Sequence, residues 1–186
     1  MSLLLDDKYD RVTSVLYPFS GLTKIDPAIL KNAADRGSKV HEVLDGMIND
    51  LGDFGVDQAI RGYIDSFNQW RGNKDFIPNV KRFYNDELLL TGECDVLYKE
   101  PGGLVLVDFK TPAQESKTWS YQASAYSYLA KKEGYDINRL EFVKLDKTGK
   151  APKVFTYDED MDAFKKVLFC YRQFFKNCKE NMLEFL

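Results

Sequence analysis

Apolar side chains recur at helical spacing in several parts of the chain. In residues 40–51 they lie three and four positions apart, and Asp26-Pro27 upstream offers an N-cap followed by a proline suited to the first helical turn. Gly37 leaves open whether this region forms one helix or two, and Gly52 is a suitable end. Further helices are expected over residues 57–70, over residues 116–132, and from Asp158 or Asp160 along the stripe Met161, Phe164, Val167, Leu168, Tyr171, Phe174, Phe175, Cys178 and Met182.

Short apolar runs bounded by turn residues predict strands. The central feature is a hairpin over residues 88–110, in which the run Leu104-Val105-Leu106-Val107 follows the turn Pro101-Gly102-Gly103. The order of elements predicts an α/β (α+β) fold, with a mixed central β-sheet flanked by helices. No repeat or long linker divides residues 1–186, so one domain is expected. Other extended segments are expected at residues 11–16, 78–83, 140–145 and 154–157, the last two joined by a turn at 146–149.

Composition narrows the class of protein. The 186 residues are 44% hydrophobic and 30% charged, which is typical of a globular protein. The net charge of -3 gives no bulk attraction to nucleic acid, although a local basic surface or bound metal ions would suffice. Three cysteines without a CxxC pair indicate a reducing, intracellular compartment and argue against a zinc site. No apolar run approaches the roughly 18 residues of a membrane helix, and no signal peptide is visible.

Two aspartates stand at the open end of the predicted hairpin. Asp95 and Asp108 are nearly equidistant from its turn, so we expect them to face each other across the strands. Lys110 shares the face of Asp108, because side-chain direction repeats every second residue. Opposed like charges are destabilising, and acids at the end of a buried strand are costly unless paired or bound to metal. A solvated hairpin with one polar face is the alternative, but the apolar runs favour a site for a divalent cation and an activated water.

Four short motifs occur in order within residues 11–130. They are Gly-x-x-x-His within Arg36-Gly37-Ser38-Lys39-Val40-His41-Glu42, then Gly92-x-x-Asp95, Asp108-x-Lys110-Thr111 and Gln122-x-x-x-Tyr126. Together they resemble the PD-(D/E)XK nuclease superfamily and, within it, the RecB-type exonuclease branch. The resemblance implies a single domain with a restriction-endonuclease-like core and the activity of a metal-dependent phosphodiesterase.

The resemblance also implies a role for each motif residue. Lys110 would orient or deprotonate the attacking water and stabilise negative charge as it develops. Gln122 and Tyr126 would position the site or the nucleic-acid strand from one face of the next helix. The metal, Mg²⁺ or Mn²⁺, would be bound by His41, Asp95, Asp108 and the backbone carbonyl of Phe109.

The outer motif residues also have plainer interpretations. His41 borders the apolar face of its helix and could be a core residue, and Gln122 and Tyr126 could belong to a helix that only packs. The acid that often precedes Gly92 in this branch is absent from residues 79–83. The candidates for that acid are Glu87, Glu42 and, ranked lower by strand parity, Glu93.

The cysteines bear on whether a cluster is bound, and the aromatic and basic residues bear on contacts to nucleic acid. Some members of the branch hold an iron–sulfur cluster on four cysteines, whereas this chain has three, so no cluster is expected. Cys170 and Cys178 are read as packing residues of the last helix. Trp119 and Tyr121 could stack with bases or pack in the core. A few of the nearby cations could contact phosphates while most are solvated, namely Arg36, Lys39, Lys117, Lys131 and Lys132.

The leading hypothesis is therefore a divalent-metal-dependent DNA nuclease. It would be an exonuclease rather than a sequence-specific endonuclease, acting on single- or double-stranded DNA ends in phage or bacterial recombination or repair. It would work in the cytoplasm, without membrane association, alongside a recombination or replication protein. The alternatives are a non-catalytic nucleic-acid-binding or assembly module that retains the nuclease fold, and an unrelated metal hydrolase.

Overall fold

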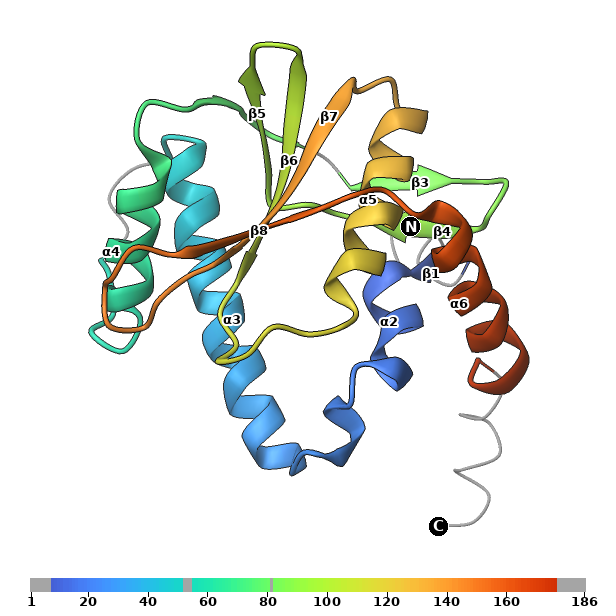
Figure 1. Ribbon diagram of the computed structural model, residues 1–186. Helices are drawn as coiled ribbons and strands as arrows, with labels where there is room; N and C mark the ends of the chain where they lie inside the picture. Colours follow the sequence, from blue (N-terminus) through green and yellow to red (C-terminus); the bar gives the residue numbers. More distant parts are fainter. Residues whose placement is uncertain (1–7, 52–54, 81, 177–186) are drawn as a thin grey trace.

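Two β-sheets form the centre of the molecule, with helices on both sides (Figure 1). The computed structural model describes residues 8–51, 55–80 and 82–176. The predicted mixed α/β fold is confirmed. The smaller sheet joins β1 (Asp10–Arg11), β4 (Leu90–Gly92) and β3 (Phe83–Asn85). The larger sheet has the strand order β2 (Asp75–Ile77), β5 (Val96–Glu100), β6 (Gly103–Lys110), β7 (Ile137–Lys144) and β8 (Lys153–Tyr157).

The larger sheet carries the predicted hairpin at its centre. β5 runs antiparallel to β6, with Val96 opposite Val107, and β7 lies parallel to β6 on its other side. β2 and β8 are antiparallel edge strands. Gly102 and Gly103 at the hairpin turn have φ angles of 103° and 141°, which residues with a side chain rarely adopt. The turn therefore depends on its two glycines.

Side chains of β6 alternate between two helical layers. Val105, Val107 and Phe109 belong to the core on one face, and Leu106 belongs to the core on the other. Because β6 is covered on both faces, its apolar run is unbroken. Figure 1 shows one helical layer on each side of the sheet. The first layer is α3 (Pro27–Ile48) with α4 (Arg61–Arg71), and the second is α5 (Trp119–Lys132) with α2 (Val12–Leu16) and α6 (Met161–Phe174).

The smaller sheet is tied to the last helix by an ion pair. Arg172 of α6 lies 2.8 Å from the buried carboxylate of Asp10 in β1, and it also donates to the carbonyl oxygen of Leu88. A buried charge is stable only with such partners. α2 packs beside α6 and is followed by two 3₁₀ turns, η1 (Tyr17–Phe19) and η2 (Leu22–Lys24).

Local signals set the ends of the long helices. The Asp26 carboxylate accepts hydrogen bonds from the N–H groups of Ala28 and Ile29, so the predicted N-cap is confirmed. α3 then continues as one helix through Gly37, which settles the choice between one helix and two. Asp160, rather than Asp158, caps α6 by accepting from the N–H of Ala163.

Several predicted boundaries were wrong. Residues 12–16 are helical rather than extended, and the edge strand precedes Pro78 instead of following it. Leu90–Gly92 does not extend the hairpin but forms the centre of the smaller sheet. The helix expected over residues 57–70 begins only at Arg61. Gly52, Cys178 and Met182 lie outside the described residues.

Candidate active site

The hairpin register brings the two predicted aspartates together. The Asp95 N–H donates to the carbonyl oxygen of Val107 at 3.1 Å, one position beyond the last paired residue, so Asp95 stands opposite Asp108. Asp95 directly precedes β5, and Asp108 lies two residues before the end of β6. Asp108 is buried, with 4% of its surface exposed, and Asp95 is partly exposed. The predicted opposition of two carboxylates is therefore present in the structure.

Helix α3 supplies His41 to this end of the hairpin. Its Nδ1 lies 2.7 Å from Asp95 Oδ1, and the Phe109 N–H donates to the other carboxylate oxygen, Oδ2, at 2.5 Å. The negative charge of Asp95 raises the pKa of His41 to about 9, against the opposing effect of burial. His41 is therefore protonated at neutral pH, and its side chain remains 37% exposed, so solvent screens the ion pair.

Helix α5 supplies a hydrogen-bonded chain to the other carboxylate. Lys110 Nζ lies 2.6 Å from Asp108 Oδ2 and donates to Gln122 Oε1 at 2.9 Å. Gln122 Nε2 in turn donates to the Tyr126 hydroxyl at 2.9 Å and reaches Asp108 Oδ1 at 3.4 Å. The Lys110 ammonium also lies 4.9 Å from the centre of the Phe142 ring. These contacts fix the position of the lysine.

Burial shifts the pKa values of groups in and beside this hydrogen-bonded chain of side chains. Loss of hydration raises the pKa of Asp108 to about 6, and Lys110 limits that rise while Asp95 adds to it. Burial also raises the pKa of the Tyr126 phenol and of the neighbouring Cys94 thiol. Both therefore stay protonated near neutral pH, which leaves the carboxylates, Lys110 and His41 as the charged groups of the site.

Gly92 of the Gly-x-x-Asp motif has a packing reason. A Cβ atom at this position would lie 2.7 Å from Cε1 of Tyr126 and 3.0 Å from Cδ1 of Leu129. Glycine thus lets the Tyr126 ring sit against β4, where its hydroxyl meets Gln122. Gly37 differs, because a Cβ there would lie 3.5 Å from Thr111 Oγ1, an ordinary contact. The glycine of the upstream motif is therefore not required by space.

The donor set suits a hard divalent cation in part. Asp108 Oδ2 is buried and accepts no hydrogen bond of good geometry, but the Lys110 ammonium lies 2.6 Å away, so a bound cation would share this oxygen with the lysine or displace it. Asp95 divides its two oxygens between His41 and the Phe109 amide. Within the described ranges, no three His, Cys, Asp or Glu side chains lie together as a ready-made metal cluster. Asp95 and Asp108 fit an ion by chemistry, whereas His41 would first have to lose its proton.

The candidates for an additional acid lie in different places. Glu93 pairs with Arg82 at 2.5 Å and Glu87 lies 3.7 Å from Lys132. Glu42 lines a cavity of about 310 Å³ together with His41 and Asp95. Asp45, one helical turn after His41, also lines this cavity. Its spacing of four residues from His41 was a signal that could have identified it.

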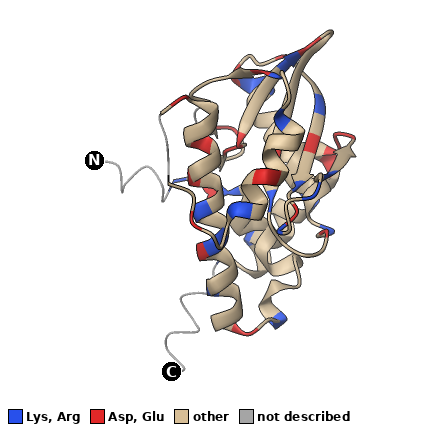
Figure 2. Cartoon of the chain, turned by 90° about the vertical axis from the view of Figure 1, so that its left-hand side faces the viewer, with Lys and Arg blue, Asp and Glu red and all other residues tan. Residues whose placement is uncertain are grey.

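Most of the cations expected near phosphates have protein partners. Lys131 lies 2.7 Å from Glu159, and Lys39 lies 3.9 Å from Asp57. Lys132 pairs with Glu87, as described above. Lys117 lines a second, larger groove that reaches Lys110. On the side of the molecule seen in Figure 2, Lys and Arg residues are interspersed with Asp and Glu.

The larger groove was not foreseen from the sequence. It has a volume of about 850 Å³ and lies between residues 13–25 and residues 110–122. Trp119, left open as a stacking or core residue, is 4% exposed, and both its ring and the neighbouring Lys110 border the groove. No pattern in residues 13–25 indicated a binding surface: residues up to Leu16 were expected to form a strand, and no element was predicted for residues 17–25.

Comparisons with known proteins add little to this geometry. No protein-family model matches the chain, and no curated protein matches it. The crystal structure of SSO0001 aligns with 92% of this chain and 78% of that chain, with a TM-score of 0.48 and 11% sequence identity. A likeness of this size carries no argument about family or chemistry. None of the helices in the described part of the chain is long and apolar enough to cross a membrane.

Proposed function

We propose that this protein is a divalent-metal-dependent nuclease that hydrolyses phosphodiester bonds in DNA. The observation that carries the proposal is the buried Asp108 carboxylate, which stands opposite Asp95 and 2.6 Å from the Lys110 ammonium. Burying a carboxylate opposite a second carboxylate is costly unless a cation is bound between or beside them. A protein that only needed stability would gain from apolar residues at these positions.

Each charged residue has a part in the proposed reaction. Asp95 and Asp108 would hold Mg²⁺ or Mn²⁺, which when bound makes water a better nucleophile and draws charge from the phosphate. Lys110 would orient the attacking water and stabilise the negative charge that develops on the phosphate oxygens. Gln122 holds Lys110 in place through its Oε1, and Tyr126 holds Gln122. His41 would act on Asp95, either as its protonated partner or, once neutral, as a further ligand.

The proposed type of nuclease and its biological process rest on the motifs alone. Their resemblance to the RecB-type branch supports an exonuclease that acts on DNA ends in phage or bacterial recombination or repair, inside the cell. The alternative, a non-catalytic nucleic-acid-binding module, is favoured by one observation. Both carboxylates already have cationic partners, since Lys110 lies beside Asp108 and His41 beside Asp95. Such internal pairs would suit a site that no longer binds metal.

A cleavage assay decides between the two. Single- and double-stranded DNA labelled at one end is incubated with the protein and Mg²⁺, Mn²⁺ or EDTA, and a circular substrate separates exonuclease from endonuclease. Cleavage should need metal and should be lost in Asp108→Ala and Lys110→Met. Lys99→Met is the matched control, because Lys99 lies on the same hairpin with its side chain 63% exposed. If wild-type protein gives no metal-dependent cleavage, or if Lys110→Met cleaves as well as Lys99→Met, the proposal fails.

A further inference from the structure

We infer that the groove beside Lys110 binds a single nucleic-acid strand, and that Tyr17 and Phe19 are the surfaces on which its bases stack. This inference rests on the proposed function, because it names the substrate form that reaches the same site. The groove lies between two segments, residues 13–25 and residues 110–122. Its volume of about 850 Å³ is within the usual range for binding pockets of drug-sized ligands, so it admits a few nucleotides.

The groove is continuous with the candidate active site. Lys110 and Gln122 line it, and both belong to the hydrogen-bonded chain that leads to Asp108. The Lys110 ammonium lies 5.8 Å from the centre of the Trp119 ring, which borders the same space. A strand lying in the groove would therefore bring a phosphate to the lysine that is proposed to act on it.

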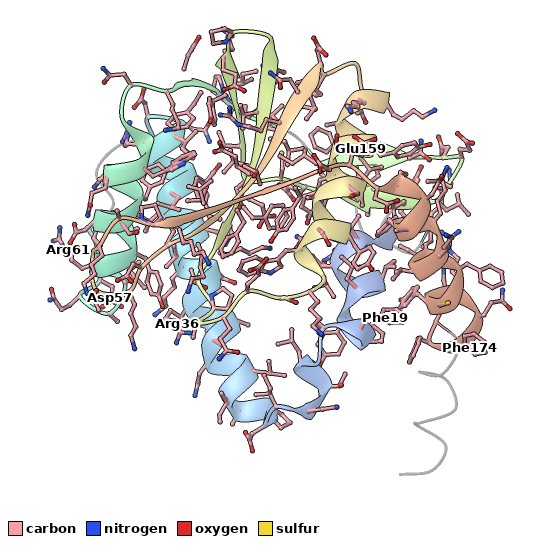
Figure 3. All side chains as sticks on the ribbon, in the orientation of Figure 1. Phe19, Arg36, Asp57, Arg61, Glu159 and Phe174 are labelled. Atoms are coloured by element: carbon pink, nitrogen blue, oxygen red, sulfur yellow. The ribbon has the colours of Figure 1, made fainter. Side chains whose placement is uncertain are left out.

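The aromatic residues of the groove are held in an exposed position. Tyr17 is 45% exposed and Phe19 is 41% exposed, on the short 3₁₀ turn η1. Pro18 stiffens the turn, and the Ser20 hydroxyl donates to the carbonyl oxygen of Tyr17 and accepts from the N–H of Leu22. Figure 3 shows Phe19 beyond the end of α2, on the side towards α6. The Phe19 ring also packs edge-on against Phe175, with ring centres 5.4 Å apart, and is left partly open to the groove. Exposed apolar side chains that gather in one groove, rather than lying singly, are typical of a binding surface.

The chemistry of the lining favours a single strand over a duplex. Proteins that grip a duplex place many cations along the phosphate backbones. Here the lining is mostly apolar, with Lys110 and Lys117 as its cations, and its carboxylate, Glu115, accepts a hydrogen bond from Tyr157. Single-strand binders instead combine a few cations with aromatic faces, because the face of any base can stack. A second copy of this chain is the other occupant that an apolar groove suggests, and the test below includes it.

Binding is measured without cleavage. A fluorescein-labelled oligothymidylate, an abasic strand of equal length and a blunt hairpin duplex are titrated with the protein in EDTA by fluorescence anisotropy. The wild-type protein should bind the oligothymidylate at least tenfold more tightly than the abasic strand or the duplex. Tyr17→Ala and Phe19→Ala should each weaken that binding about tenfold, as expected for loss of one base stack. Tyr17→Phe should retain it.

The control is Phe169→Ala, which removes a ring that is 63% exposed on α6 and does not line the groove. It should bind like the wild type, and thermal melts should show all variants folded. Equal binding of the abasic and thymidine strands overturns the inference, as does unchanged binding by Tyr17→Ala. A dimer in sedimentation that Tyr17→Ala converts to a monomer also overturns it in favour of a second copy. Base-dependent binding without metal-dependent cleavage would support the inference while refuting the nuclease, and the reverse result would do the opposite.

Discussion

Replacing Asp108 with Asn should abolish cleavage and, at neutral pH, stabilise the protein. Asn has nearly the same shape as Asp, so the substitution removes a charge without opening a cavity. The side chain of Asp108 is only 6% exposed, and its carboxylate must ionise away from water. Such a group lowers stability, and the proposed function supplies a reason for keeping it.

The magnitude follows from the pKa of Asp108, which burial raises from 3.8 to about 6. Because the folded protein holds this proton more tightly than the unfolded chain, the stability contributed by the protonated form is complete below pH 3.8. It is lost as the pH rises towards 6. The difference of about two pKa units corresponds to about 3 kcal/mol at neutral pH. The attraction of Lys110 is already contained in this value, since it limits the rise.

The assay is urea unfolding of the wild type and Asp108→Asn in EDTA at a series of pH values. The variant should be more stable by about 3 kcal/mol at pH 7, and the difference should shrink to below about 1 kcal/mol near pH 4. For a domain of this size, the neutral-pH gain corresponds to a melting temperature higher by about 6–12 °C. Asp162→Asn is the control for loss of a charge at the surface, since its side chain is 89% exposed. A wild type that is as stable as Asp108→Asn at pH 7, or a difference that does not change with pH, would refute the reasoning.

Three further predictions concern the surroundings of the carboxylates. The stability that the His41–Asp95 pair provides should be complete below pH 6.5 and lost as the pH rises towards 9, so thermal melts should show this decline in the wild type and not in His41→Gln. Over the same window, calorimetry should show Mn²⁺ affinity rising in the wild type, because His41 must lose its proton before it can bind metal, and a flat profile would contradict that role. Gly92→Ala should lower the free energy of unfolding in urea by about 1–3 kcal/mol and reduce cleavage, because its Cβ would lie 2.7 Å from the Tyr126 ring. Gly37→Ala should leave the free energy of unfolding unchanged or raise it slightly, because alanine favours a helix interior. Equal effects of the two glycine substitutions would show that the packing at Gly92 is unimportant.

Prediction from the sequence succeeded where the pattern was long or the turn chemistry specific. The hairpin was identifiable from two apolar runs around Pro101-Gly102-Gly103, and its register followed from symmetry about the turn. α3 was identifiable from Asp26 and an apolar stripe, although Gly37 made its continuity uncertain. That glycine is tolerated because Val40 and Leu44, both buried against the sheet, hold the helix in place.

Prediction failed where tertiary contacts decide the structure of a short segment. Val12, Val15 and Leu16 have helical spacing, but a run of five residues rich in β-branched side chains gives little preference for a helix. Burial of all three residues beneath α5 and α6 selects the helix. A strand was expected to begin at Pro78, but the edge strand β2 ends at Ile77. Proline has no N–H group and cannot donate a hydrogen bond to a neighbouring strand.

The candidate site shows the same division between local and distant information. Asp95, Asp108 and Lys110 are placed by the hairpin alone, and their proximity could be read from parity and turn position. His41 meets Asp95 across 54 positions of sequence, and no periodicity connects them. Only the resemblance of the motifs suggested their proximity.

Gly92 is important to the site because it lacks a side chain, not because of any chemical group. It carries no reactive group, yet it admits the Tyr126 ring, whose hydroxyl accepts a hydrogen bond from Gln122. Gln122 accepts in turn from Lys110, so the position of the proposed catalytic ammonium depends on a missing side chain on another strand. Cleavage lost in Gly92→Ala with Asp108 still buried and ionisable would therefore locate the defect in the placement of Lys110, not in the carboxylates.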